Sequence, residues 1–161
     1  MQKSINLIIG CHSHQPVGNF DHVFEEAYHK AYKPFLDVLE RFPAIKVTHH
    51  YSGPLLDWFA ANQPGFLERL AGLVSTGQVE IMGGGYYEPL LCAIPARDSV
   101  AQIERMTAFC EHHFGQKPKG MWLTERVWEP HMPSLLHSAG IEYTALDDMH
   151  FMCSGLHRDE L

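Results

Sequence analysis

The sequence predicts an α/β fold with a parallel sheet or barrel. Short apolar, β-rich runs alternate along the chain with longer stretches in which apolar residues recur at helical spacing. Polar and ionisable residues directly follow the apolar runs. Alternation of this kind is typical of βα units, whose strands are parallel and whose crossovers are right-handed.

The first strand is expected over residues 5–10, an unbroken apolar run of the kind that is buried on both faces of a parallel sheet. Apolar residues then recur at helical spacing over residues 21–42, with a break at Pro34, which would begin a second helix. A second strand over residues 45–51 ends at a Ser-Gly-Pro turn.

Two short helices are expected over residues 55–61 and 66–75, and Gly77 supplies a stop for the second. A third strand over residues 79–82 runs into the glycine triplet of residues 83–85. Trp58 lies on an apolar helical face and is expected in the core.

A long helix is expected over residues 97–114, followed by a fourth strand that contains the apolar run 121–123. A helix over residues 133–139 and a fifth strand over 143–146 complete the pattern. Five strands are too few to close a barrel. The chain is therefore expected to be the amino-terminal part of a larger domain.

Composition restricts the classes of partner and compartment. The 161 residues carry a net charge of −7 and no run of Lys and Arg, which argues against nucleic acid or an anionic membrane as a partner. The four cysteines form no C-x-x-C pair, the initial apolar run is too short for a signal peptide, and nothing approaches a membrane span. We expect a cytoplasmic protein; its oligomeric state is left open.

Every expected strand ends in side chains that can do chemistry. These are His12 and His14 after the first strand, His49 and His50 at the second, Tyr86, Tyr87 and Glu88 after the third, Glu125 after the fourth, and Asp147, Asp148 and His150 after the fifth. In parallel barrels and open α/β sheets the active site lies at the carboxyl ends of several strands. The sequence therefore predicts a site at this edge.

The histidines differ in how strongly they indicate a site. A single strand-end histidine more often caps a loop than binds a ligand. His12 and His14 are two residues apart and face the same side of an extended segment, which favours a ligand or substrate role for both. His49 and His50 point to opposite faces, so at most one of them should reach the site.

Glu80 and the glycine triplet have both structural and functional interpretations. Glu80 lies inside a strand, where a carboxylate needs a partner or a function, and a salt bridge to Arg126 is the structural alternative. Residues 83–85 match neither the dinucleotide nor the P-loop spacing. They more simply let the backbone approach a ligand closely.

Trp122 and Trp128 flank Glu125, which suits a carbohydrate site because aromatic rings stack on the apolar face of a sugar. Glycoside cleavage uses two carboxyl groups, one protonated and one ionised. Trp122 and Glu125 are three residues apart and would face opposite sides of a regular strand. For both to meet one substrate, the strand must end or bulge near Thr124.

Four segments resemble glycoside hydrolase family 57: HSHQP at 12–16, GQVEIMGGGYYEP at 77–89, WLTERVWEP at 122–130 and YTALDDMHF at 143–151. The resemblance implies an incomplete (β/α)7 barrel of which about the first five strands lie in this chain. It also implies a retaining enzyme, an α-amylase or 4-α-glucanotransferase, that acts on α-glucans or malto-oligosaccharides and needs no metal or organic cofactor.

The resemblance implies that Glu125 is the catalytic nucleophile and that His14, Glu80 and Trp122 contact substrate. His12, Trp128 and Asp148 are further candidates for substrate binding. The acid/base aspartate of the family lies downstream of the stretch that matches 143–151, so neither Asp147 nor Asp148 is that residue. Residues 1–161 alone are therefore expected to be inactive.

Two alternatives stay open at this point. Imidazoles and carboxylates at the strand ends could bind zinc, as in polysaccharide deacetylases and zinc-dependent α-mannosidases. That interpretation leaves the segment from Trp122 to Trp128 unexplained. The chain could also be an inactive carbohydrate-binding fragment. The sequence does not decide between hydrolysis and transglycosylation, nor does it give glucan length or bond type.

Overall fold

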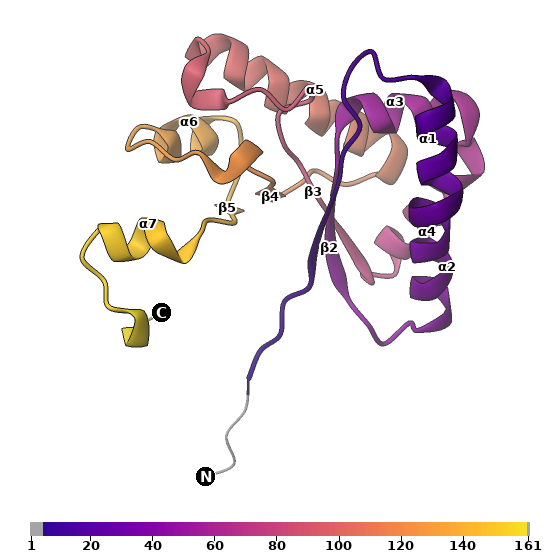
Figure 1. Cartoon of the computed structure of the whole chain (residues 1–161), viewed down its shortest axis with the longest axis horizontal. Helices are drawn as coiled ribbons and strands as arrows, with labels where there is room; N and C mark the ends of the chain where they lie inside the picture. Colours follow the sequence, from indigo (N-terminus) through magenta and orange to yellow (C-terminus); the bar gives the residue numbers. More distant parts are fainter. Residues whose placement is uncertain (1–4, 161) are drawn as a thin grey trace.

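The computed structural model describes residues 5–160 as an α/β fold of parallel strands and intervening helices (Figure 1). One sheet has the order β1-β2-β3, and a second pairs β4 with β5, all in parallel. The strands are β1 (Gly10–Ser13), β2 (Val47–Tyr51), β3 (Val79–Met82), β4 (Gly120–Met121) and β5 (Tyr143–Thr144). An isolated parallel bridge between Gly83 and Met121 joins the sheets, so the strands follow one another in chain order.

The first strand differs from the expectation. It begins only at Gly10, and the side chains of Ile5, Leu7 and Ile8 are 90%, 79% and 82% exposed, so burial of this run on both faces was a wrong prediction. β1 is an edge strand of its sheet. Burial on both faces needs neighbours on both sides, and the apolar run lies beyond the point where β2 pairs with β1.

The helices follow the expected pattern closely. They are α1 (Asp21–Ala27), α2 (Lys33–Arg41), α3 (Gly53–Asn62), α4 (Pro64–Ser75), α5 (Ala96–Phe114), α6 (Met132–Ser138) and α7 (Asp148–Cys153), with a π-helical turn η1 (Tyr28–Tyr32) and 3-10 turns η2 (Leu91–Ala93), η3 (Thr124–Arg126) and η4 (Arg158–Glu160). The expected break at Pro34 is wrong: Tyr32 and Lys33 keep right-handed helical backbone, so the chain stays helical through the π turn into α2, and Pro34 lies in the first turn of α2. α7 was not predicted.

The main core lies between one face of β1-β2-β3 and the helices α1 to α5. Alternation along β2 turns Val47, His49 and Tyr51 toward these helices, where Phe59 is fully buried. Trp58 is 9% exposed and belongs to the same core, as expected. A second cluster packs α6 and the first half of α5 against Met121 and Leu123.

The other face of the sheet is left open by these helices (Figure 1). Thr48, Glu80 and Met82 line a groove of about 660 Å³ there, together with Trp122 and Tyr143. Gly10 and Cys11, the first residues of β1, also border this groove. Within residues 5–160, none of the helices combines the length and apolarity that crossing a membrane requires.

Candidate functional site

Three imidazoles converge on one carboxylate at the carboxyl ends of β1 and β2. Nδ1 of His14 contacts Oε2 of Glu88, while Nε2 of His12 and Nδ1 of His50 lie 3.6 and 3.4 Å from Oε1. His12 pairs with His50 in the register of the two strands, and their Nδ1 atoms are 2.8 Å apart in a hydrogen bond. Parallel pairing therefore brings residues 38 positions apart into one cluster.

Glu88 enters this cluster from the loop after the glycine triplet. Its φ of 51° lies in the left-handed region, and its backbone N–H donates to the carbonyl of Gly85. Its side chain is only 7% exposed, and burial raises the pKa of its carboxyl while His14 opposes that effect. Strained backbone of this kind gathers at functional sites and persists only where the surroundings hold it.

Trp122 stacks on His12, with ring centroids 4.4 Å apart and an angle of 9° between the planes. The guanidinium of Arg126 lies 5.7 Å from the Trp122 ring on which it stacks. Glycine at position 84 allows the His50 ring to pack directly against the backbone, because a Cβ there would lie 2.6 Å from Nε2 of His50. The ring of His12 is thereby fixed between Trp122 and His50.

The turn η3 explains how Glu125 and Trp122 can serve one site. β4 ends at Met121, and Glu125 and Arg126 have φ values of 52° and 53°. The strand thus ends close to Thr124, which is the condition set by the sequence for Trp122 and Glu125 to meet one substrate. Glu125 is exposed, and its negative charge is one of the causes that raise the pKa of Glu88, which places it near that carboxylate.

Glu80 and Arg126 have partners other than each other. The hydroxyl of Tyr143 donates to Oε1 of Glu80 at 2.6 Å. Arg126 Nε donates to Oδ1 of Asp147 at 2.8 Å. The salt bridge between Glu80 and Arg126, considered as an alternative from the sequence, is thus wrong, and Glu80 keeps one oxygen toward the groove that it lines with Trp122.

The remaining candidates lie outside the histidine cluster. Trp128 packs against the second apolar cluster, and Asp148, half exposed at the start of α7, accepts from Arg158 at 2.8 Å. His49 faces the helices, as one of the two neighbouring histidines had to, and its Nε2 is hydrogen-bonded to Ser13 Oγ at 2.9 Å. His50 is the member of that pair that reaches the site.

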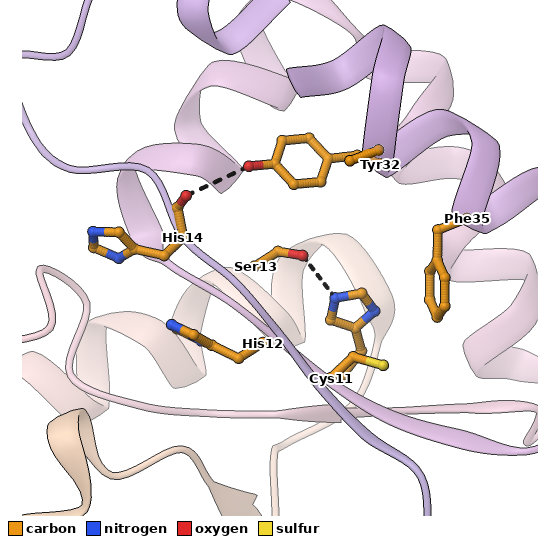
Figure 2. Close-up of a pocket in the computed structure, with 8 residues that line it drawn as sticks. Cys11, His12, Ser13, His14, Tyr32 and Phe35 are labelled. Carbon is orange, nitrogen blue, oxygen red and sulfur yellow. Dashed lines mark hydrogen bonds between the residues drawn. The ribbon is translucent and has the colours of Figure 1, made fainter. Parts of the chain in front are cut away.

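A second hollow of about 470 Å³ lies between β1 and the helices, with Cys11, Tyr32 and Phe35 among its lining (Figure 2). The hydroxyl of Tyr32 donates to the carbonyl of His14 and accepts from Nε2 of Gln15 at 3.0 Å. Tyr32 belongs to the π turn η1. The π turn therefore helps to hold the loop that carries His14.

Sequence reasoning did not select Glu88 or His50 as site residues. Both were visible as strand-end groups, Glu88 in the Tyr-Tyr-Glu-Pro segment that follows the glycine triplet. The register between β1 and β2 decides which histidine meets His12, and the positive φ of Glu88 turns its side chain inward. Neither feature leaves a periodic signal in the sequence.

Folding should become less favourable as the pH falls, because buried histidines stay neutral. Burial lowers the pKa of His12 to about 4 and that of His49 to about 3, and it lowers the pKa of His50 as well. Below about pH 6.5, the pKa of histidine in the unfolded chain, the unfolded chain binds protons that these histidines do not bind in the folded chain. Each such proton costs about 1.4 kcal/mol of unfolding free energy per pH unit until the folded pKa is reached.

Urea denaturation from pH 7 to pH 4 measures this loss. His49→Gln keeps an acceptor for Ser13 and removes one titrating group, so its stability should fall less steeply than that of the unaltered chain. Exposed His137→Gln is the matched control and should leave the slope unchanged. Equal slopes in all three proteins would contradict a neutral, buried His49.

Comparison with known proteins identifies the family. The sequence model of glycosyl hydrolase family 57 matches residues 8–159. The chain belongs to this family. It is 51% identical over 159 residues to a 4-α-glucanotransferase of Thermococcus litoralis, covering 99% of this chain and 24% of that protein. It is 48% identical over 161 residues to an α-amylase of Pyrococcus furiosus, covering 100% of this chain and 25% of that protein.

Solved structures of family 57 members share the fold. The crystal structure of the Thermococcus litoralis 4-α-glucanotransferase superimposes with a TM-score of 0.94, covering 98% of this chain and 25% of that one. A family 4 carbohydrate esterase of Bacillus anthracis, 14% identical, superimposes with a TM-score of 0.62 over 86% of this chain and 57% of its own, a likeness of fold alone. This family 57 chain spans about a quarter of the length of its curated relatives.

Proposed function

We propose that the family 57 protein containing these residues is a retaining enzyme on α-1,4-glucans, either a glycoside hydrolase or a 4-α-glucanotransferase. Residues 1–161 would form the amino-terminal portion of one incomplete (β/α)7 barrel, with the remaining strands and a helical domain outside them. The family membership and the 51% identity to a 4-α-glucanotransferase support this proposal. The free state of all four cysteines agrees with a cytoplasmic location.

The observation that carries the proposal is the position of Glu125. Glu125 lies in a turn with left-handed backbone, three residues after Trp122, whose indole stacks on His12. Trp122 and Glu80 line an open groove of about 660 Å³ beside this turn. The Trp122 indole can stack on the apolar face of a sugar, and the Glu80 carboxylate in the same groove can accept hydrogen bonds from its hydroxyls.

The chemistry that this arrangement can perform is a double displacement. Ionised Glu125 attacks the anomeric carbon, and the bond to the leaving oxygen breaks as an acid gives that oxygen a proton. Water or a sugar hydroxyl then releases the glycosyl group from Glu125. The acid would be an aspartate outside residues 1–161, about 5 Å from Glu125, as retaining enzymes require.

The sugar that is attacked would be bound by His12, His14, Glu80 and Trp122. Glu88 would fix the imidazole of His14, and His50 would fix that of His12. Trp128 and Asp148 would contact more distant parts of the glucan.

A chimera tests the proposal. Residues 1–161 replace the matching segment of the Thermococcus litoralis 4-α-glucanotransferase, to which they are 51% identical. The chimera should convert malto-oligosaccharides. Product analysis distinguishes hydrolysis, which gives only shorter sugars, from glucan transfer, which gives longer and shorter sugars together. Residues 1–161 alone should give no turnover. A folded but inactive chimera, or release of reducing sugar by the 161-residue chain, would contradict the assignment.

A further inference from the structure

We propose that His12, His14 and Glu88 form a binding site for one divalent transition-metal ion, with Zn²⁺ as the preferred occupant. This inference does not depend on glycoside chemistry. It rests on the cluster itself, where each of the three side chains offers a ligand atom and all three atoms lie within 4.8 Å of one another.

The spacing of His12 and Glu88 is close to what zinc requires, and His14 would have to move to complete it. Zinc is bound at about 2.0 to 2.2 Å by imidazole nitrogen and carboxylate oxygen, which places ligand atoms a little over 3 Å apart in a tetrahedron. Nε2 of His12 lies 3.6 Å from Oε1 of Glu88. Nδ1 of His14, two residues from His12 on an extended segment, is in direct contact with Oε2, so the His14 side chain must turn outward to admit an ion, which its 42% exposure allows.

The cluster also contains a buried acceptor that the protein leaves unused. The side chain of Glu88 is 7% exposed, and its Oε1 atom has no hydrogen-bond partner among the described residues. This atom lies between His12 and His50. Burying a carboxylate oxygen without a partner is costly, and a cation at the cluster would satisfy it.

Hydrogen bonds around the cluster suit metal ligation. A ligating histidine typically uses its other ring nitrogen to bind a neighbouring group, which fixes the tautomer and the ring orientation. Nδ1 of His12 is hydrogen-bonded to Nδ1 of His50 at 2.8 Å, which leaves Nε2 of His12 free to face an ion. Trp122, stacked on His12, holds the same ring from its other face.

The number of protein ligands predicts an open site. Two imidazoles and one carboxylate leave a fourth position for water or a sugar hydroxyl, and the His14 side chain is 42% exposed at the entrance. The same side chains are those proposed to hold the glucan, so bound ion and glucan should exclude each other. Only this last consequence rests on the proposed function.

Equilibrium dialysis of the chelator-treated 161-residue chain against Zn²⁺, without any glucan, tests the site. We expect one tightly held ion per chain. Glu88→Gln and His14→Ala should each weaken Zn²⁺ binding at least about tenfold, since even the loss of an outer-shell partner costs 10- to 100-fold. His137→Ala, on the exposed face of α6, is the control and should bind as the unaltered chain does.

Visible absorption of bound Co²⁺ and circular dichroism separate loss of the metal site from loss of folding. Co²⁺ in place of Zn²⁺ should give the strong visible absorption of a tetrahedral site, and the band should be lost in His14→Ala. Circular dichroism reports folding of each variant; if Glu88→Gln fails to fold, His14→Ala decides, because its side chain is partly exposed. Absence of stoichiometric binding, or equal affinity in the folded variants and the control, would overturn the proposal.

Discussion

Glu125→Gln in the chimera should lower the turnover of malto-oligosaccharides on the order of a thousandfold or more, the scale on which removal of a nucleophile acts in other enzymes. Glutamine keeps the size of the side chain and loses the negative charge, so it cannot form the glycosyl ester. Glu125 is exposed, and the substitution should leave the unfolding free energy almost unchanged. Initial rates and chemical denaturation measure the two effects separately.

Glu142→Gln is the matched control for this substitution. Glu142 is an exposed glutamate paired with Lys119 at 3.2 Å, and such surface pairs contribute little to stability. Its loss should leave turnover within about twofold of the unaltered chimera. Near-normal rates in Glu125→Gln, or an equal loss in both variants, would remove Glu125 from the role of nucleophile.

Phe59→Ala should lower the unfolding free energy of the 161-residue chain by about 3 to 5 kcal/mol, the usual cost of removing a buried aromatic ring. Phe59 is 0% exposed, and its ring centroid lies 4.3 Å from that of Phe66 and 5.6 Å from that of Tyr32. The cavity would open under the π turn whose Tyr32 holds the His14 loop. Urea denaturation measures the loss.

Phe42→Ala serves as the control, because Phe42 is 48% exposed at the end of α2. This substitution should change the unfolding free energy by no more than about 0.5 kcal/mol. A loss under about 1 kcal/mol for Phe59→Ala would mean that the aromatic cluster between β2 and the helices does not stabilise the fold as described.

The sequence predicted the elements that have strong periodicity. The third strand was expected over residues 79–82 and is found there, and the long helix over 97–114 differs from α5 by one residue. Both have regular apolar spacing and glycine at an end. The first strand was misplaced because the prediction followed the apolar run of residues 5–10. A strand is defined by hydrogen-bonded pairing with its neighbour, and the pairing with β2 begins at Gly10.

The site was predictable only as a set of strand ends. Parallel topology brings His12 and Trp122 to one edge, so their contact follows from the order of the elements. The partners of individual side chains do not follow. Tyr143 donates a hydrogen bond to Glu80, and Arg126 donates one to Asp147. Both contacts depend on turn geometry and strand register, which the apolar periodicity of the sequence does not reveal. Glu88 depends on a left-handed backbone that few non-glycine residues adopt.

Trapping of the covalent intermediate tests the role of Glu125 most directly. The chimera is incubated with a 5-fluoro-α-glucosyl fluoride, whose glycosyl-enzyme forms faster than it is hydrolysed, and digested for peptide mass spectrometry. We expect one glycosyl adduct per chain, on the peptide that contains Glu125, and none in Glu125→Gln. An adduct on a different carboxylate, or full turnover in an enzyme that never carries one at Glu125, would contradict the assignment.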